Sequence, residues 1–136
     1  AIATGGATMT PRLADAFIDA TDGSEQPVTP TPGPTVPLPS ATGAYLRTSL
    51  QSVVRDGTAS FGFEGFDLEA WPIAGKTGSA ERGAGNDVSW FVSFAPADQP
   101  KYVVAVAITQ AGLGSEAAVP VARAIHEGLD DLKKTD

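Results

Sequence analysis

Residues 74–81 read AGKTGSAE, and residues 88–96 read VSWFVSFAP. In an extended strand successive side chains point to opposite faces, so Lys76 and Gly78 share one face while Thr77 and Ser79 share the other. Gly78 leaves a gap where another group can approach the backbone, and Lys76 brings positive potential beside that gap. A cation and two hydroxyls at consecutive extended positions suit the edge of a sheet that binds a carboxylate.

The sequence around this motif strand predicts three antiparallel strands in succession, at about 70–80, 88–96 and 101–110. Gly83 and Gly85 suit a hairpin turn between the first two strands, and the PADQP segment at 96–100 suits the second turn. Both connections are too short for parallel crossovers, so the sheet is an antiparallel meander. The third strand is almost continuously apolar, which predicts burial on both faces. Trp90 and Phe91 are expected in the core rather than against a ligand.

A first helix is expected to precede the motif strand. Ser40 or Thr42 can act as its N-cap, and the helix should run to about Asp56, where Gly57 ends it. Its buried face is predicted from the apolar spacing of Leu46, Leu50, Val53 and Val54. The loop at 59–69 is expected to pack against the body through Phe61, Phe63 and Phe66.

A second helix is expected after the third strand, which Gly112 and Gly114 interrupt. Ser115 is a suitable N-cap. The apolar stripe is predicted to consist of Val121, Ala124, Ile125 and Leu129. His126 on this helix is interpreted as a surface or packing residue without a catalytic role. With two helices packed on an antiparallel sheet, the predicted fold class is α+β.

The N-terminal part is less regular. Residues 1–7 are interpreted as the last turns of a helix that two glycines end. An extended conformation is favoured for residues 8–18 because Pro11 lies early, although the apolar spacing there also suits a helix. The Pro-rich loop at 21–39 contains six prolines and is predicted to be neither helix nor central strand. It is interpreted as a surface loop or polyproline-like arm, with a cleft border or partner contact as the alternative.

Composition excludes several classes of function. The net charge is −7, which argues against a nucleic-acid partner because phosphate binding needs clustered Lys and Arg. There is no cysteine and a single histidine, so thiolate sites and multi-histidine metal sites are excluded. The sequence predicts no cofactor and no metal.

The motif strand and its neighbour resemble the third and fourth strands of the transpeptidase domain in class B penicillin-binding proteins. In that family the pattern usually reads AGKTGTAE and then WFVGFAP; the KTG tripeptide also occurs in class A β-lactamases. Ser79 replaces the usual Thr and keeps a hydroxyl, and Ser93 replaces the usual Gly. Residues 1–6, 10–13 and 45–59 are similar to the family too, so the resemblance covers most of the chain.

The resemblance implies a β-lactamase/transpeptidase-like fold and a peptidoglycan D,D-transpeptidase that cross-links stem peptides through a serine acyl-enzyme and binds β-lactams. Its implied substrate-binding residues are Lys76, Thr77, Gly78 and Ser79. Lys76 would orient the substrate, and the Thr77 and Ser79 hydroxyls would hold the carboxylate of the D-alanyl-D-alanine terminus. The backbone N–H of Ser79 would supply half of an oxyanion hole, which gives Lys76 and Ser79 the catalytic roles.

The family's nucleophile motif, S-x-x-K, and its second motif, S-x-N, occur at none of the serines in this sequence. The chain, residues 1–136, is therefore expected to be the C-terminal portion of such a domain and inactive alone. The resemblance implies as partners the stem peptide, β-lactams and the remaining part of the domain that carries S-x-x-K and S-x-N. It also makes a membrane glycosyltransferase a candidate partner and places the parent protein at the extracytoplasmic face of the bacterial cell membrane.

Two alternatives remain. One lies in the same superfamily, a D,D-carboxypeptidase or β-lactamase fragment; the other is a non-catalytic binding or scaffold module. The WFVSFAP segment and the Gly57-Thr58-Ala59 segment favour the class B transpeptidase.

Overall fold

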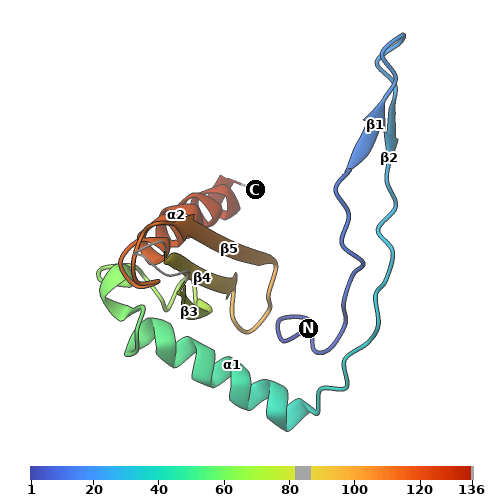
Figure 1. Ribbon diagram of the computed structural model, residues 1–136. Coiled ribbons are helices and arrows are strands. Elements are labelled where there is room, and N and C mark those ends of the chain that lie inside the picture. The colour runs from blue at the N-terminus through green and yellow to red at the C-terminus, as the bar shows by residue number, and fades with distance from the viewer. Residues whose placement is uncertain (82–86, 136) are drawn as a thin grey trace.

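The protein is described by a computed structural model that covers residues 1–81 and 87–135, with side chains up to Leu132 (Figure 1). Its elements are, in chain order, β1 (Ala16–Ile18), β2 (Glu25–Pro27), α1 (Ser40–Arg55), the 3-10 helix η1 (Ser60–Phe63), β3 (Ala74–Ala80), β4 (Val88–Ala95), β5 (Tyr102–Thr109) and α2 (Ala118–Thr135). The order and packing of these elements confirm the α+β fold class.

Strands β3, β4 and β5 form an antiparallel meander in that order, as predicted. The pairing aligns Lys76 with Val92 and Gly78 with Trp90. Among the described strands β3 pairs only with β4, so it lies at the edge of the sheet. The first strand is shorter than predicted, since regular pairing begins at Ala74. Gly83 and Gly85, which were expected in the first turn, lie outside the described residues.

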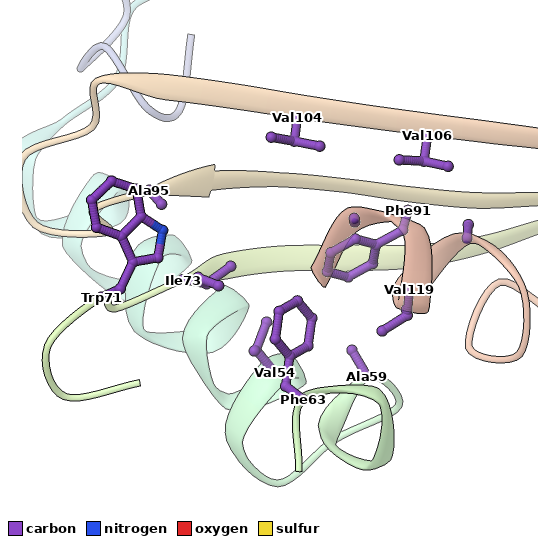
Figure 2. Close-up of a cluster of buried hydrophobic side chains, with 12 residues drawn as sticks. Val54, Ala59, Phe63, Trp71, Ile73, Phe91, Ala95, Val104, Val106 and Val119 are labelled. Carbon is purple, nitrogen blue, oxygen red and sulfur yellow. The ribbon is translucent and has the colours of Figure 1, made fainter. Parts of the chain in front are cut away.

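The main core lies on one face of this sheet (Figure 2). Helix α1 lies along β3, and α2 lies across β4 and β5 on the core side. The aromatic members of the core meet there, with Phe63 against Phe91 at a ring-centroid distance of 6.0 Å. The fully buried members are Val54, Ala59, Phe63, Trp71, Ile73, Phe91, Ala95, Ala118, Val119 and Ala122. The motif strand is thus packed along α1, while its partners β4 and β5 pack against α2.

The opposite face of the sheet is covered only around Phe94, by Ile2, Ala3 and Leu50, and is otherwise open. Two predictions are wrong here. Strand β5 is buried on one face only: Val104 is 7% exposed, whereas its neighbour Val103 is 66% exposed. Trp90 is also outside the core, at 41% exposure, while Phe91 is fully buried as expected. The reason is that α2 packs on the Phe91 side of β4 and β5, so alternate side chains of each strand face opposite surroundings.

Helix α2 turns a different face to the sheet than the sequence predicted. Of the predicted stripe, Leu129 packs against the core as expected, whereas Val121 and Ile125 are about half exposed. The buried side chains are instead those of Val119, Ala122 and His126, at helical spacing. The prediction was wrong because it counted His126 as polar, whereas its ring is buried with hydrogen-bond partners on both nitrogens.

Helix starts were also mispredicted. Helix α1 has Pro39 at its N-cap, and neither Ser40 nor Thr42 caps it through a side chain. Helix α2 begins at Ala118, two residues later than a Ser115 cap would place it. Its first backbone N–H donates instead to Ser89 Oγ of β4, at 3.0 Å.

The loop after α1 follows the sequence prediction in part. Phe63 is buried and Phe66 packs against the core, with their rings edge to face at 5.6 Å. Phe61, which was expected to pack with them, is 88% exposed. Because η1 is a single short turn, its successive side chains point in different directions, and Phe61 falls on the solvent side.

The N-terminal segment folds as a turn and an arm. Residues 2–6 form a turn without a helix; the N–H of Gly6 donates to the Ala1 carbonyl, at 2.8 Å. The extended conformation predicted for residues 8–18 is confirmed, since β1 pairs with β2 and Met9 bridges to Pro32. The Pro-rich segment is thus one side of a long hairpin that projects from the body (Figure 1). Within the described residues no helix is long and apolar enough to cross a membrane.

Candidate functional site at the β3 edge

The motif strand carries its cation at an accessible position. Lys76 is exposed on the open face of the sheet, and its Nζ donates to the Thr77 carbonyl at 2.7 Å. A depression of about 410 Å³ lies next to it. The apolar side chains that line the depression include Ile2, Leu50, Val92, Phe94 and Val103. An anionic group entering here would meet one ammonium against a largely apolar wall.

The two hydroxyls of the motif lie on the other face of β3, as the strand alternation predicts. Thr77 Oγ1 lies 2.7 Å from Oγ1 of Thr58. Ser79 Oγ accepts the backbone N–H of Gly114 at 3.2 Å. Thr77 is half-buried and Ser79 is exposed. The structure therefore brings Lys76 and the two hydroxyls to one strand edge, with the hydroxyls engaged by residues outside the motif.

A loop from the other end of the chain supports this edge. A Cβ at Gly114 would lie 2.5 Å from the carbonyl oxygens of both Gly78 and Trp90, so the loop packs directly on the paired backbones of β3 and β4. Ser89 Oγ holds the same loop by donating to the Leu113 carbonyl at 2.9 Å. Residue spacing could not predict that Ser89 holds this loop, because its hydrogen-bond partners lie more than 20 positions away in the sequence.

A buried polar chain lies behind the motif strand. The indole N–H of Trp71 donates to His126 Nδ1 at 3.3 Å. Indole is a donor only, so Nδ1 is unprotonated and the ring proton is on Nε2. That N–H points at Ser93 Oγ, 2.8 Å away, and Ser93 pairs with Gly75, the residue before Lys76. The serine that departs from the usual family glycine is thus the partner of the buried histidine.

Burial lowers the pKa of His126 to about 4. In the unfolded chain the same group titrates near its ordinary pKa of about 6.5. Between these two values the unfolded state binds one more proton than the folded state. The free energy of unfolding contributed by this group is therefore full above about pH 6.5 and is lost as the pH falls toward 4.

We expect the free energy of unfolding of the His126→Gln variant to depend less steeply on pH between pH 4 and 6.5. The difference in slope should correspond to at most one bound proton, since His126 is the only histidine in the sequence. Denaturant unfolding of wild type and variant across this range measures the difference in slope. Equal slopes would contradict the assignment of a neutral, buried imidazole.

Comparison with known proteins gives consistent matches. A family model for the penicillin binding protein transpeptidase domain matches residues 1–127. Stage V sporulation protein D of Bacillus subtilis (strain 168) is 32% identical over 141 residues, which cover 94% of this chain and 21% of that protein. A peptidoglycan D,D-transpeptidase FtsI homolog of Chlorokybus atmophyticus is 32% identical over 104 residues, 68% of this chain and 15% of that protein. The chain spans only about a fifth or less of these relatives.

Solved structures agree with these matches. PBP2 of Pseudomonas aeruginosa in complex with WCK 5153 has a TM-score of 0.72 and 32% identity, over 94% of this chain and 28% of that one. Penicillin-binding protein A of Mycobacterium tuberculosis, as a ceftriaxone acyl-enzyme complex, has a TM-score of 0.73 and 26% identity, over 93% and 29% of the two chains. The similarity extends over nearly the whole chain.

Proposed function

The chain belongs to the penicillin-binding protein transpeptidase family, and from that premise we propose that it forms the C-terminal portion of a peptidoglycan D,D-transpeptidase domain. In this proposal residues 74–80 form the edge that receives a stem peptide ending in D-alanyl-D-alanine. The observation that carries it is the exposed Lys76 ammonium on the same strand edge as the hydroxyls of Thr77 and Ser79.

Each motif residue then has a defined task. Lys76 supplies the positive potential that attracts the substrate carboxylate, which the Thr77 and Ser79 hydroxyls bind. The backbone N–H of Ser79 acts as one donor of an oxyanion hole that stabilises the tetrahedral intermediate. Gly78 keeps the strand surface free of a side chain, so the substrate backbone can lie along β3 as an added strand.

The nucleophile in this proposal comes from sequence outside these 136 residues, since none of their serines lies in S-x-x-K. That serine would attack the carbonyl of the penultimate D-alanine and expel the terminal D-alanine, forming an acyl-enzyme. An amine of a neighbouring stem peptide would then take the acyl group and regenerate the serine. β-Lactams would acylate the same serine; the M. tuberculosis relative forms an acyl-enzyme complex with ceftriaxone.

Membership of this family also supports a proposal for the cellular location of the parent protein. Cross-linking of stem peptides takes place where the cell wall is built, so we place the site at the extracytoplasmic face of the bacterial cell membrane. The partners proposed there are the rest of the transpeptidase domain and a membrane glycosyltransferase that supplies glycan strands. The net charge of −7 gives no basis for a nucleic-acid partner.

The test is a partition experiment with the full-length protein. A donor peptide ending in D-alanyl-D-alanine is supplied with increasing amounts of an acceptor peptide that carries a free amine. We expect the cross-linked product to increase at the expense of the hydrolysed donor, and penicillin to abolish both products. Liquid chromatography with mass spectrometry measures the ratio.

The outcomes separate the alternatives. Hydrolysis that is independent of the acceptor would favour a D,D-carboxypeptidase, and hydrolysis of the β-lactam itself would favour a β-lactamase. Neither product, together with no covalent labelling by a fluorescent penicillin, would favour a non-catalytic binding module.

A further inference from the structure

Thr58 touches the motif strand although it lies outside the motif. It follows Gly57 at the exposed start of the loop after α1, and its Oγ1 lies 2.7 Å from Thr77 Oγ1. The position of α1 along β3 fixes this approach, because the chain leaves the helix only three residues before Thr58. The contact joins two side-chain hydroxyls directly, without a backbone group between them.

The direction of this hydrogen bond decides whether Thr77 can donate a hydrogen bond to a ligand. A hydroxyl has one proton to donate and two lone pairs to accept with. When Thr58 donates to Thr77, the proton of Thr77 is free to point at a ligand. When Thr77 donates to Thr58, its lone pairs face the ligand instead, and an anion is repelled. Only the first arrangement suits a carboxylate.

Ser79 shows the same arrangement on the same face of β3. Its Oγ accepts the Gly114 backbone N–H at 3.2 Å, and a backbone N–H can only donate. The hydroxyl of Ser79 therefore keeps its proton for another acceptor. With Thr58 as donor to Thr77, both hydroxyls of the motif have an occupied acceptor side and an available donor, which is what a carboxylate with two oxygens requires.

We infer that Thr58 is a positioning residue, which orients the Thr77 hydroxyl as a donor to the carboxylate of a ligand bound at β3. The inference rests on the proposed function, and it adds a residue of the α1–η1 loop to the binding edge. A chain from Thr58 through Thr77 to an anion is also cooperative, since each bond polarises the next.

The test compares two ligands that differ only in the carboxylate. Penicillin and its methyl ester, whose ring carboxylate is masked, are used to acylate the full-length protein and its Thr58→Val variant, which keeps the side-chain shape without the hydroxyl. We expect the second-order rate of acylation by penicillin to fall about tenfold in the variant, the effect of weakening one hydrogen bond to a charged group. The rate for the ester should change by less than about twofold, because the ester offers no anion to bind.

Three controls complete the design. Thr58→Ser keeps the hydroxyl and should retain the wild-type rate with penicillin. Thr42→Val makes the same change at an exposed position of α1 and should leave both rates unchanged. The melting temperature of each variant reports separately on folding.

Equal losses with penicillin and with the ester would overturn the inference, because Thr58 would then act only through the fold. Unchanged rates with both ligands would overturn it as well. In these two cases the wild-type protein is still acylated, so the proposed function stands. A wild-type protein that neither ligand acylates would overturn the proposed function and this inference together.

Discussion

Replacing Gly114 with alanine is expected to lower the free energy of unfolding by about 3 kcal/mol, the upper part of the range for overpacked sites. The added Cβ would lie 2.5 Å from the carbonyl oxygens of Gly78 and Trp90. Both obstacles are backbone atoms in paired strands, so neither can rotate away as a flexible side chain can. The loop must then move off the strands, and the bond from the Gly114 N–H to Ser79 Oγ is lost with it.

Gly128→Ala is the matched control for this prediction. Gly128 lies in α2, and a Cβ there meets nothing within 4 Å. Alanine in an exposed helix position is favoured over glycine by up to about 1 kcal/mol, so this variant should be slightly more stable. The same substitution is thus expected to have opposite signs at the two positions.

Denaturant unfolding of the transpeptidase domain that contains the chain measures both variants. The rate of acylation by penicillin is the second readout, and it should fall in Gly114→Ala because Ser79 loses its support. If Gly114→Ala has the stability and the acylation rate of the wild-type protein, the loop at Gly114 does not pack on β3 as described.

Local pattern was enough to predict the meander. Strand alternation and short turns fixed the order of β3, β4 and β5 and the face on which Lys76 lies. The apolar spacing of α1 likewise predicted that Val54 is buried. These features depend on neighbours within a few residues, which the sequence shows directly.

Long-range partners could not be predicted from spacing. Ser89 caps a helix that begins 29 positions later, and Thr58 meets a strand hydroxyl 19 positions away. The buried face of α2 was misjudged because the partners that make a buried His126 acceptable, Trp71 and Ser93, come from other elements. The environment of polar residues could therefore not be predicted where their hydrogen-bond partners lie on elements distant in sequence.

The open face of the sheet shows another limit. The apolar run of β5 allows burial on both faces, but the packing of α2 decides which face is covered. Val103 and Trp90 are exposed because α2 packs on the other face. The sequence shows where the apolar side chains are, but it does not show which of them another element covers.

Lys76→Ala in the full-length protein is expected to have the largest effect on activity. Lys76 is exposed at the β3 edge beside an apolar depression, and in the proposed function it provides the positive charge that the substrate carboxylate meets. Removal of one preorganised electrostatic group from such a site costs about 10²- to 10³-fold in rate. Folding should be little affected, because among the described residues the Lys76 side chain bonds only the neighbouring Thr77 carbonyl.

Lys101→Ala is the matched control. Lys101 is an exposed lysine between β4 and β5, so its removal changes the net charge by the same amount away from the motif. General attraction of an anionic ligand by the protein's charge is therefore equal in the two variants, and only the local role of Lys76 differs.

The second-order rate constant for acylation by penicillin, measured on the wild-type protein and these two variants, tests the β3 edge as the carboxylate-binding site most directly. We predict a loss of about 10²- to 10³-fold for Lys76→Ala and a wild-type rate for Lys101→Ala. A near-normal rate for Lys76→Ala, in a protein that penicillin does acylate, would contradict the assignment of this edge.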